Sequence, residues 1–148
     1  MADFDLTFHH LGLATPRPDK ARKFLRGLGY RHGESIFDPE QKVNLIFCEH
    51  SQMPAVEIIS PGQGGGPIDK MLSTNPNGLI YHPCYSSQDL TRSLARMEAA
   101  GTRVLCVSPP KPAILFNGAL VSFYSVVGIG LIEILEGFTP RPSANPHS

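Results

Sequence analysis

The feature that most constrains this fold is an internal repeat. His10 and Gly29 are 19 positions apart, and so are His82 and Gly101, which sets the second half at an offset of 72 residues. Repetition at a fixed offset indicates one supersecondary unit used twice. The two halves then differ by one short insertion, which we place in residues 109–118.

Each half has the pattern of a βαβββ unit. Runs rich in β-branched and apolar residues predict strands, and apolar residues at helical spacing predict one helix between the first and second strand. The helices are expected to start at Asp19 and Asp89, as capping residues, and to end at Gly29 and Gly101. The expected strands are 8–14, 32–37, 43–48, 55–60, 79–85, 103–107, 120–126 and 130–135, and a short helical segment is expected at 68–72.

The length of 148 residues fits one compact domain. We expect this single domain to span residues 1–136, with its two modules at about 8–61 and 79–136. The tail at 137–148 is rich in proline and polar residues, so we expect it to be disordered.

The balanced charge argues against large anionic partners. Thirteen basic residues offset thirteen acidic ones, so no field of one sign would attract a nucleic acid or an anionic membrane. The longest mostly apolar stretch, 121–135, is too short to cross a bilayer, which takes about 20 residues. A small-molecule partner is therefore favoured, with no nucleic acid and no membrane.

The N-terminus and the cysteines favour a cytoplasmic protein. Residues 1–8 lack the basic flank and the apolar run of a secretory signal. Cys48, Cys84 and Cys106 are odd in number and widely spaced, so we expect reduced, buried thiols and no disulfide framework.

Each half carries a histidine on its first strand and a glutamate on its last. Because side chains alternate along a strand, only one of His9 and His10 can face the concave side of the sheet, and we choose His10. Glu57 and Glu133 have apolar neighbours, and a glutamate buried there needs a charged partner or a metal. Glu136 falls on the opposite face and is expected to be solvated.

Two imidazoles and two carboxylates make a ligand set that suits Zn, Ni, Co, Mn or Fe as one divalent metal ion. This interpretation takes the metal ligands as His10, Glu57, His82 and Glu133. The alternative is that the histidines are hydrogen-bonded core residues and the glutamates face solvent. Pro83 removes a backbone donor beside His82, so that strand is expected to bulge or to lie at a sheet edge.

The sequence resembles the vicinal oxygen chelate superfamily, which includes glyoxalases, bleomycin resistance proteins and dioxygenases, over about residues 8–136. Within it, the likeness is greatest to methylmalonyl-CoA epimerases. The segments that carry the resemblance are 10–14, 39–43, 56–61, 66–72 and 130–135.

The resemblance implies an α+β fold in which paired βαβββ modules form a curved mixed sheet around a metal site. It also implies a homodimer and an enzyme that abstracts a proton next to a metal-bound carbonyl. Glu133 would be the catalytic base, with Glu57 as the second catalytic candidate. The residues that could line the substrate pocket are Tyr85, Phe116, Asn117 and Phe123.

Four functions remain open at this point. Returning the proton to the opposite face gives an epimerase, and moving it to the adjacent carbon gives a glyoxalase I-type lactoylglutathione lyase. A non-catalytic protein that binds small molecules such as antibiotics is a further reading, as is an iron-dependent ring-cleaving dioxygenase. A scaffold without metal is the structural alternative.

Overall fold

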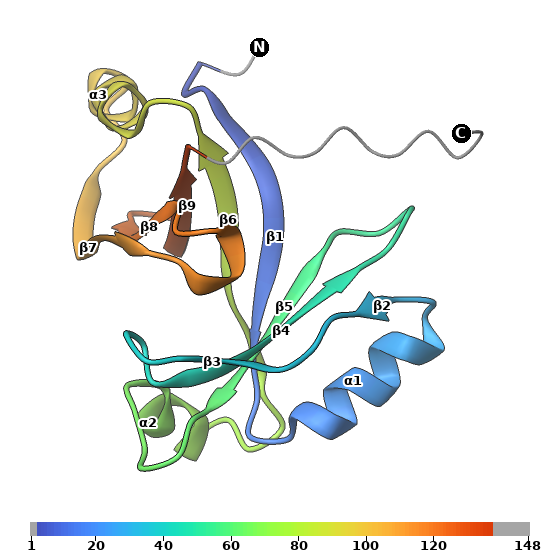
Figure 1. Ribbon diagram of the computed structural model, residues 1–148. Coiled ribbons are helices and arrows are strands. Elements are labelled where there is room, and N and C mark those ends of the chain that lie inside the picture. Colours follow the sequence, from blue (N-terminus) through green and yellow to red (C-terminus); the bar gives the residue numbers. More distant parts are fainter. Residues whose placement is uncertain (1–2, 138–148) are drawn as a thin grey trace.

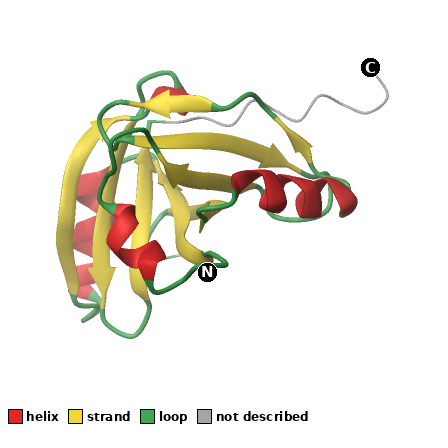
Figure 2. Ribbon diagram, turned by 90° about the horizontal axis from the view of Figure 1, so that it is seen from below, coloured by secondary structure: helices red, strands yellow, loops and turns green. Residues whose placement is uncertain are grey.

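The computed structural model describes residues 3–137. Apart from Gly137, the tail expected at 137–148 therefore lies outside the described residues. Residues 3–137 form one curved sheet of nine strands with three α-helices (Figures 1 and 2). The strands are β1 (Leu6–Ala14), β2 (Arg31–His32), β3 (Ile36–Asp38), β4 (Val43–Glu49), β5 (Val56–Pro61), β6 (Leu79–Ser87), β7 (Val104–Pro112), β8 (Leu120–Val126) and β9 (Gly130–Glu136). The helices are α1 (Pro18–Gly27), α2 (Ile68–Ser73) and α3 (Leu90–Ala99), with a 3-10 turn at Ile114–Phe116.

The sheet confirms the predicted α+β fold of paired modules. Its strand order is β2-β4-β5-β1-β6-β9-β8-β7, with β3 beside β4. In each half the first strand pairs in parallel with the last, β1 with β5 and β6 with β9. The halves are joined by the antiparallel pair β1–β6, which therefore lies at the centre of the sheet.

Helices α1 and α3 pack on one face of the sheet. Leu25 of α1 packs into a cluster with Ile46 and Ile58, and Met97 of α3 packs with Ile132. The opposite face is partly covered by α2 at one end of the sheet. The inner face, opposite α1 and α3, is where the candidate site lies.

The helix ends differ from the expectation in one place. Asp89 caps α3 as predicted, because its Oδ1 accepts a hydrogen bond from Arg92 N. Helix α1 instead begins at Pro18, and Asp19 lies within its first turn, because proline at the first helical position needs no backbone donor. Gly29 follows this helix with a φ of 98°.

Prolines occur in the interior of two strands. Strand β6 is central, so the edge alternative for Pro83 is wrong. Pro83 pairs in register with Leu11, and the nearest register shift on β6 lies between His82 and Ile80. Strand β7 runs on to Pro112 with two register shifts. It tolerates its prolines because it is an edge strand with one unpaired side.

The expectation for the thiols is met at two of the three cysteines. Cys48 and Cys84 are buried, whereas Cys106 is exposed. Cys106 lies on β7 between Leu105 and Val107, which are also exposed. The edge position leaves this strand without the covering layer that buries the other two thiols.

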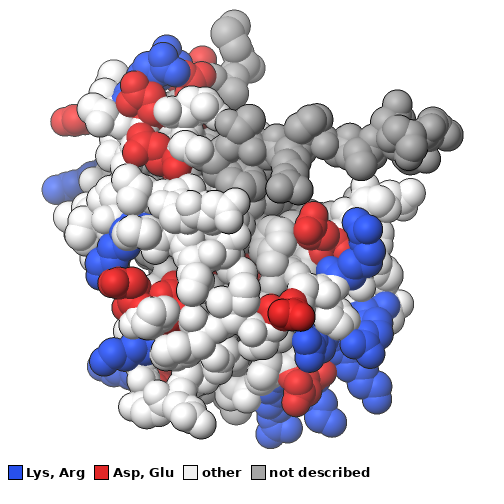
Figure 3. Space-filling model, viewed as in Figure 1, with Lys and Arg blue, Asp and Glu red and all other residues white. Residues whose placement is uncertain are grey.

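The described surface carries mixed charge. In the view of Figure 3, acidic and basic side chains are interspersed, and the basic ones are densest at lower right, where α1 lies in Figure 1. Among residues 3–137, no helix is both long and apolar enough to cross a membrane.

Thiol labelling tests this burial pattern. Burial raises the pKa of Cys48 to about 11 and also raises the pKa of Cys84. Both thiols therefore stay protonated at pH 8, and a thiolate-specific reagent should modify Cys106 alone. Mass spectrometry should find one labelled thiol in the native protein and all three cysteines labelled after denaturation. Rapid native labelling of Cys48 would contradict the packing under α1.

Candidate active site

The four predicted ligands come from four neighbouring strands of the sheet. His10 is on β1, Glu57 on β5, His82 on β6 and Glu133 on β9, and these strands are consecutive in the order β5-β1-β6-β9. The parallel ladders place Glu57 beside Gly12 and Glu133 beside Cys84. The pairing of first and last strands therefore carries all four side chains to the middle of the sheet.

All four side chains are buried on the inner face. The exposed fractions are 0% for His10, 5% for Glu57, 1% for His82 and 4% for Glu133. The solvent-facing alternative for the glutamates is therefore wrong, because their strand neighbours occupy the outer face under the helices.

His10 lies closest to the two carboxylates. Its Nε2 is 3.3 Å from Glu133 Oε1 and 3.9 Å from Glu57 Oε2. The His82 ring is farther away, with its centroid 6.4 Å from that of His10. The structure thus brings the four residues to one place, with His82 outside the tightest group.

His9 also reaches the inner face, which corrects the expectation that only one of the two histidines could. The β1–β6 register shifts between Phe8 and His10, and such a bulge breaks strict alternation. His9 Nδ1 lies 2.7 Å from His10 Nδ1. Strand periodicity gives no sign of this bulge.

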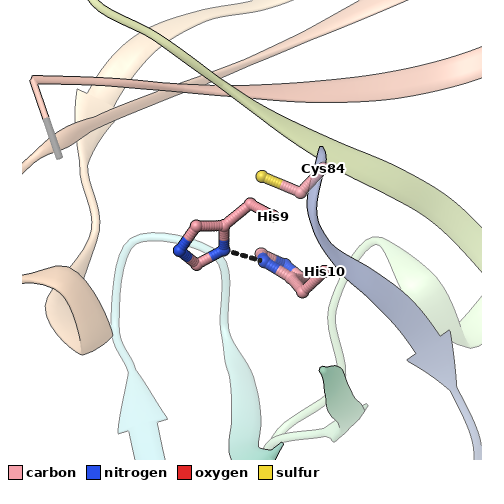
Figure 4. A group of neighbouring side chains, drawn as sticks. All are labelled: His9, His10 and Cys84. Carbon is pink, nitrogen blue, oxygen red and sulfur yellow. Dashed lines mark hydrogen bonds between the residues drawn. The ribbon is translucent and has the colours of Figure 1, made fainter. Parts of the chain in front are cut away.

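A second possible ligand group overlaps the first. The ligand atoms of His9, His10 and Cys84 lie within 4.8 Å of one another. Figure 4 shows the hydrogen bond between the two imidazoles, with the Cys84 thiol nearby. Burial and the nearby Glu133 both raise the pKa of Cys84. A metal would therefore have to displace a tightly held thiol proton to bind there.

The two buried glutamates have opposite electrostatic environments. Burial, the charge of Glu133 and that of Asp38 raise the pKa of Glu57 well above its ordinary value. Burial would also raise the pKa of Glu133, but contact with His10 and the field of His82 outweigh it, so this pKa is lowered. Glu57 therefore favours the neutral carboxyl form, and Glu133 favours the charged form.

The donor set fits a divalent cation. Within the described chain, His10 Nε2, His82 Nδ1 and Glu133 Oε1 are buried without a hydrogen-bond partner. Buried polar atoms are normally paired. His10 Nε2 and Glu133 Oε1 lie 3.3 Å apart, so a cation bound by both would satisfy both atoms. Imidazole nitrogen and carboxylate oxygen are the atoms that Zn and its neighbours bind.

The predicted pocket residues divide between the two faces. Phe116 stacks on His10 at a centroid distance of 5.8 Å, and Phe123 meets His82 edge-on at 5.1 Å. Tyr85 lies on the outer face, where it contacts Phe8 and lines a separate cavity, because β6 alternates and Cys84 faces inward. Asn117 ends the 3-10 turn in a left-handed conformation.

Two cavities adjoin the site. A very small one, of about 10 Å³, touches Glu57 and Glu133. A larger one of about 240 Å³ is lined by Phe123, Lys111 and Glu40, among others. Gln41 and Val121 line both cavities, so the larger one neighbours the small one that touches the two carboxylates.

Asp38 lines the small cavity and Glu40 lines the larger one, and neither was predicted from the sequence. Asp38 is 2% exposed, and its Oδ1 accepts hydrogen bonds from the backbone N–H groups of Glu40 and Gln41. This turn places Glu40 at the larger cavity. The Asp-Pro pair at 38 and 39 is a turn signal that could have indicated it.

The family model of the Glyoxalase/Bleomycin resistance protein/Dioxygenase superfamily matches residues 9–123. The chain belongs to this superfamily. A relative from Cereibacter sphaeroides, named ethylmalonyl-CoA/methylmalonyl-CoA epimerase, is 32% identical over 130 residues, which cover 80% of this chain and 96% of the relative. The mitochondrial methylmalonyl-CoA epimerase of Dictyostelium discoideum is 26% identical, with 86% of this chain and 76% of the relative covered.

Solved structures of superfamily members share the fold. The crystal structure of methylmalonyl-CoA epimerase from Mycobacterium tuberculosis matches with a TM-score of 0.74 at 19% identity, covering 96% of this chain and 93% of that one. A Streptomyces coelicolor methylmalonyl-CoA epimerase in complex with 2-nitronate-propionyl-CoA matches with a TM-score of 0.65 at 22% identity, covering 88% and 97%. The chain is thus a homologue of enzymes named as epimerases.

Gly12 makes room for the imidazole of His82. It pairs with His82 across the β1–β6 ladder. A Cβ at Gly12 would lie 2.6 Å from His82 Cε1 and 2.8 Å from its Nε2. Real Cβ atoms do not approach other atoms so closely. The imidazole can therefore take this position only because Gly12 has no side chain.

The substitution Gly12→Ala should therefore destabilise the protein by about 1–3 kcal/mol, as overpacking does. Gly27→Ala is the matched control, because a Cβ at Gly27 meets nothing within 4 Å, and in α1 it should be neutral or stabilising. Urea unfolding of both variants gives the comparison. Equal stability of Gly12→Ala and wild type would show that His82 does not pack on this glycine.

Proposed function

We propose that this protein is an epimerase of 2-alkylmalonyl-CoA thioesters, with methylmalonyl-CoA as its principal substrate. The observation that carries the proposal is the buried set of two histidines and two glutamates, in a chain 32% identical to a relative named ethylmalonyl-CoA/methylmalonyl-CoA epimerase. Such a substrate has an acidic C–H bond between a thioester and a carboxylate. Its inversion needs only removal and return of one proton.

His10, Glu57, His82 and Glu133 would hold one divalent cation. Zn, Ni, Co, Mn and Fe are the candidates, and the mixed nitrogen and oxygen set does not choose among them. When bound, the cation would polarise the thioester carbonyl and stabilise the negative charge that develops as the neighbouring proton leaves.

The two glutamates would carry the proton. Strands β5 and β9 flank the central β1–β6 pair, so Glu57 and Glu133 reach the site from opposite sides. Epimerisation needs an acid–base group on each face of the reacting carbon, and this arrangement supports it. Glu133 would be the base for one enantiomer, and Glu57 would return the proton from the other side.

The larger cavity would receive the substrate. It shares Gln41 and Val121 with the small cavity at the buried carboxylates, and its wall carries the cationic Lys111 and a further carboxylate, Glu40. Lys111 would attract the free carboxylate or the phosphates of an acyl-CoA. Phe116 and Phe123, which pack on the two histidines, would exclude water from the reacting carbon.

Two sequence-based expectations extend this proposal. The homodimer and the cytoplasmic location both remain predictions from the sequence. Neither is needed for the proton transfer described here.

Proton exchange is the direct test of the reaction. In deuterated water, the protein should exchange the C2 proton of methylmalonyl-CoA, and NMR or mass spectrometry follows the label. Glu133→Gln should slow this exchange by about 100-fold to 10,000-fold, as loss of a general base does. Glu49→Gln, an exposed position at the end of β4, is the control and should exchange at the wild-type rate. Turnover of a methylglyoxal hemithioacetal without any such exchange would favour the glyoxalase reading.

Metal content tests the ligand set separately from activity. Purified untagged protein should contain about one divalent metal ion per chain, and His82→Ala should lose it. Cys84→Ala should keep it if the histidines and glutamates are the ligands. The reverse pattern, with metal lost in Cys84→Ala and kept in His82→Ala, would assign the metal to His9, His10 and Cys84 instead. Elemental analysis by mass spectrometry distinguishes the two patterns.

A further inference from the structure

The imidazole of His9 is positioned inside the site by a defect in β1. The register shift between Phe8 and His10 turns His9 inward, beside His10. Its ring lies 5.3 Å from that of Phe116 and 6.1 Å from that of Phe47. His9 thus forms part of a packed group of rings around His10.

The contact between the two histidines requires one nitrogen to donate a hydrogen bond and the other to accept it. The two Nδ1 atoms are 2.7 Å apart, which is a hydrogen-bond distance. One Nδ1 must carry the proton, and the other must offer its lone pair.

The other nitrogen of His10 decides which of the two donates. His10 Nε2 points toward the carboxylates, 3.3 Å from Glu133 Oε1 and 3.9 Å from Glu57 Oε2. A metal shared with those carboxylates must bind this nitrogen through its lone pair. The proton of neutral His10 then resides on Nδ1, and His9 Nδ1 lies where the acceptor must be.

We propose that His9 is a positioning residue that accepts a hydrogen bond from His10 Nδ1–H and so holds His10 as an Nε2 metal ligand. This inference rests on the metal site of the proposed function. A ligating histidine usually donates its other N–H to a carboxylate, a carbonyl or water. Here a second histidine takes that place.

The surrounding rings support this role. Phe116 is stacked on His10 with an interplanar angle of 29°, while His9 meets both His10 and Phe116 edge-on, at 78° and 88°. Phe47 closes the group with its ring centroid 5.6 Å from that of His10. The packing therefore restricts rotation of His10, and the hydrogen bond to His9 selects its tautomer.

Two substitutions of His9 separate hydrogen bonding from packing. His9→Leu removes the acceptor but still fills the space with an apolar side chain. His9→Asn presents an amide oxygen close to the position of Nδ1. His32→Leu is the matched control. His32 lies on the short strand β2 at the sheet edge, where it forms a hydrogen bond with Arg26. Competition with a chromophoric chelator gives the Zn²⁺ affinity of each variant.

We expect His9→Leu to weaken Zn²⁺ binding by about 10-fold to 100-fold. His9→Asn should restore most of that affinity, and His32→Leu should bind as wild type does. Affinity unchanged in His9→Leu would overturn the inference. Loss of binding in both His9 variants would also overturn it, because it would make His9 itself a ligand.

The tautomer is read directly by ¹⁵N NMR of histidine-labelled protein with Zn²⁺ bound. The expected spectrum shows His10 protonated at Nδ1 and coordinated through Nε2, and His9 with an unprotonated, uncoordinated Nδ1. Coordination of His10 through Nδ1 would overturn the inference. Absence of Zn²⁺ binding by the wild-type protein would instead refute the metal site of the proposed function, so the two failures are distinguishable.

Discussion

The antiparallel ladder between β1 and β6 is the contact on which the rest of the structure depends. Each module alone is a small sheet with its first strand at an edge, and an edge strand leaves a row of unpaired backbone groups. Pairing the two first strands satisfies both edges and makes them the centre of one sheet. The same pairing sets His10 and His82 on adjacent strands. The pairing that completes the sheet therefore also brings the site together.

The site itself concentrates polar groups where burial is costly. Glu57 and Glu133 are nearly inaccessible, and an ionised carboxylate away from water is destabilising unless it is paired or coordinated. Contact with His10 lowers the pKa of Glu133, whereas Glu57 is left with a raised pKa. A divalent cation would offset this cost, which gives the arrangement a physical reason beyond family likeness.

Several parts of the fold and site could be predicted from local patterns. Strand β8 has the expected bounds, Asp89 caps α3, and the equal spacing of His10–Gly29 and His82–Gly101 is matched by equal topology. The burial of Glu57 and Glu133 also followed from their apolar neighbours.

Other features depended on contacts distant in sequence. Glu136 was expected to be solvated, yet its carboxylate accepts a hydrogen bond from Leu90 N at the start of α3. Cys106 has an apolar local sequence but lies exposed on an edge strand. Tyr85 was placed at the pocket from its residue type, while the alternation of β6 sends it to the outer face. In each case the partner, or its absence, comes from another element.

By itself, the sequence determined the repeat, the βαβββ order of each half and the four residues suited to a divalent metal. These are recorded in spacing and residue type, because helical and strand periodicity act over a few neighbouring positions. Only the tertiary structure decided that a bulge turns His9 inward, that Gly12 makes room for His82 and that Asp38 holds Glu40 at the cavity. Those outcomes depend on how one strand registers against another, and register is set by the whole sheet.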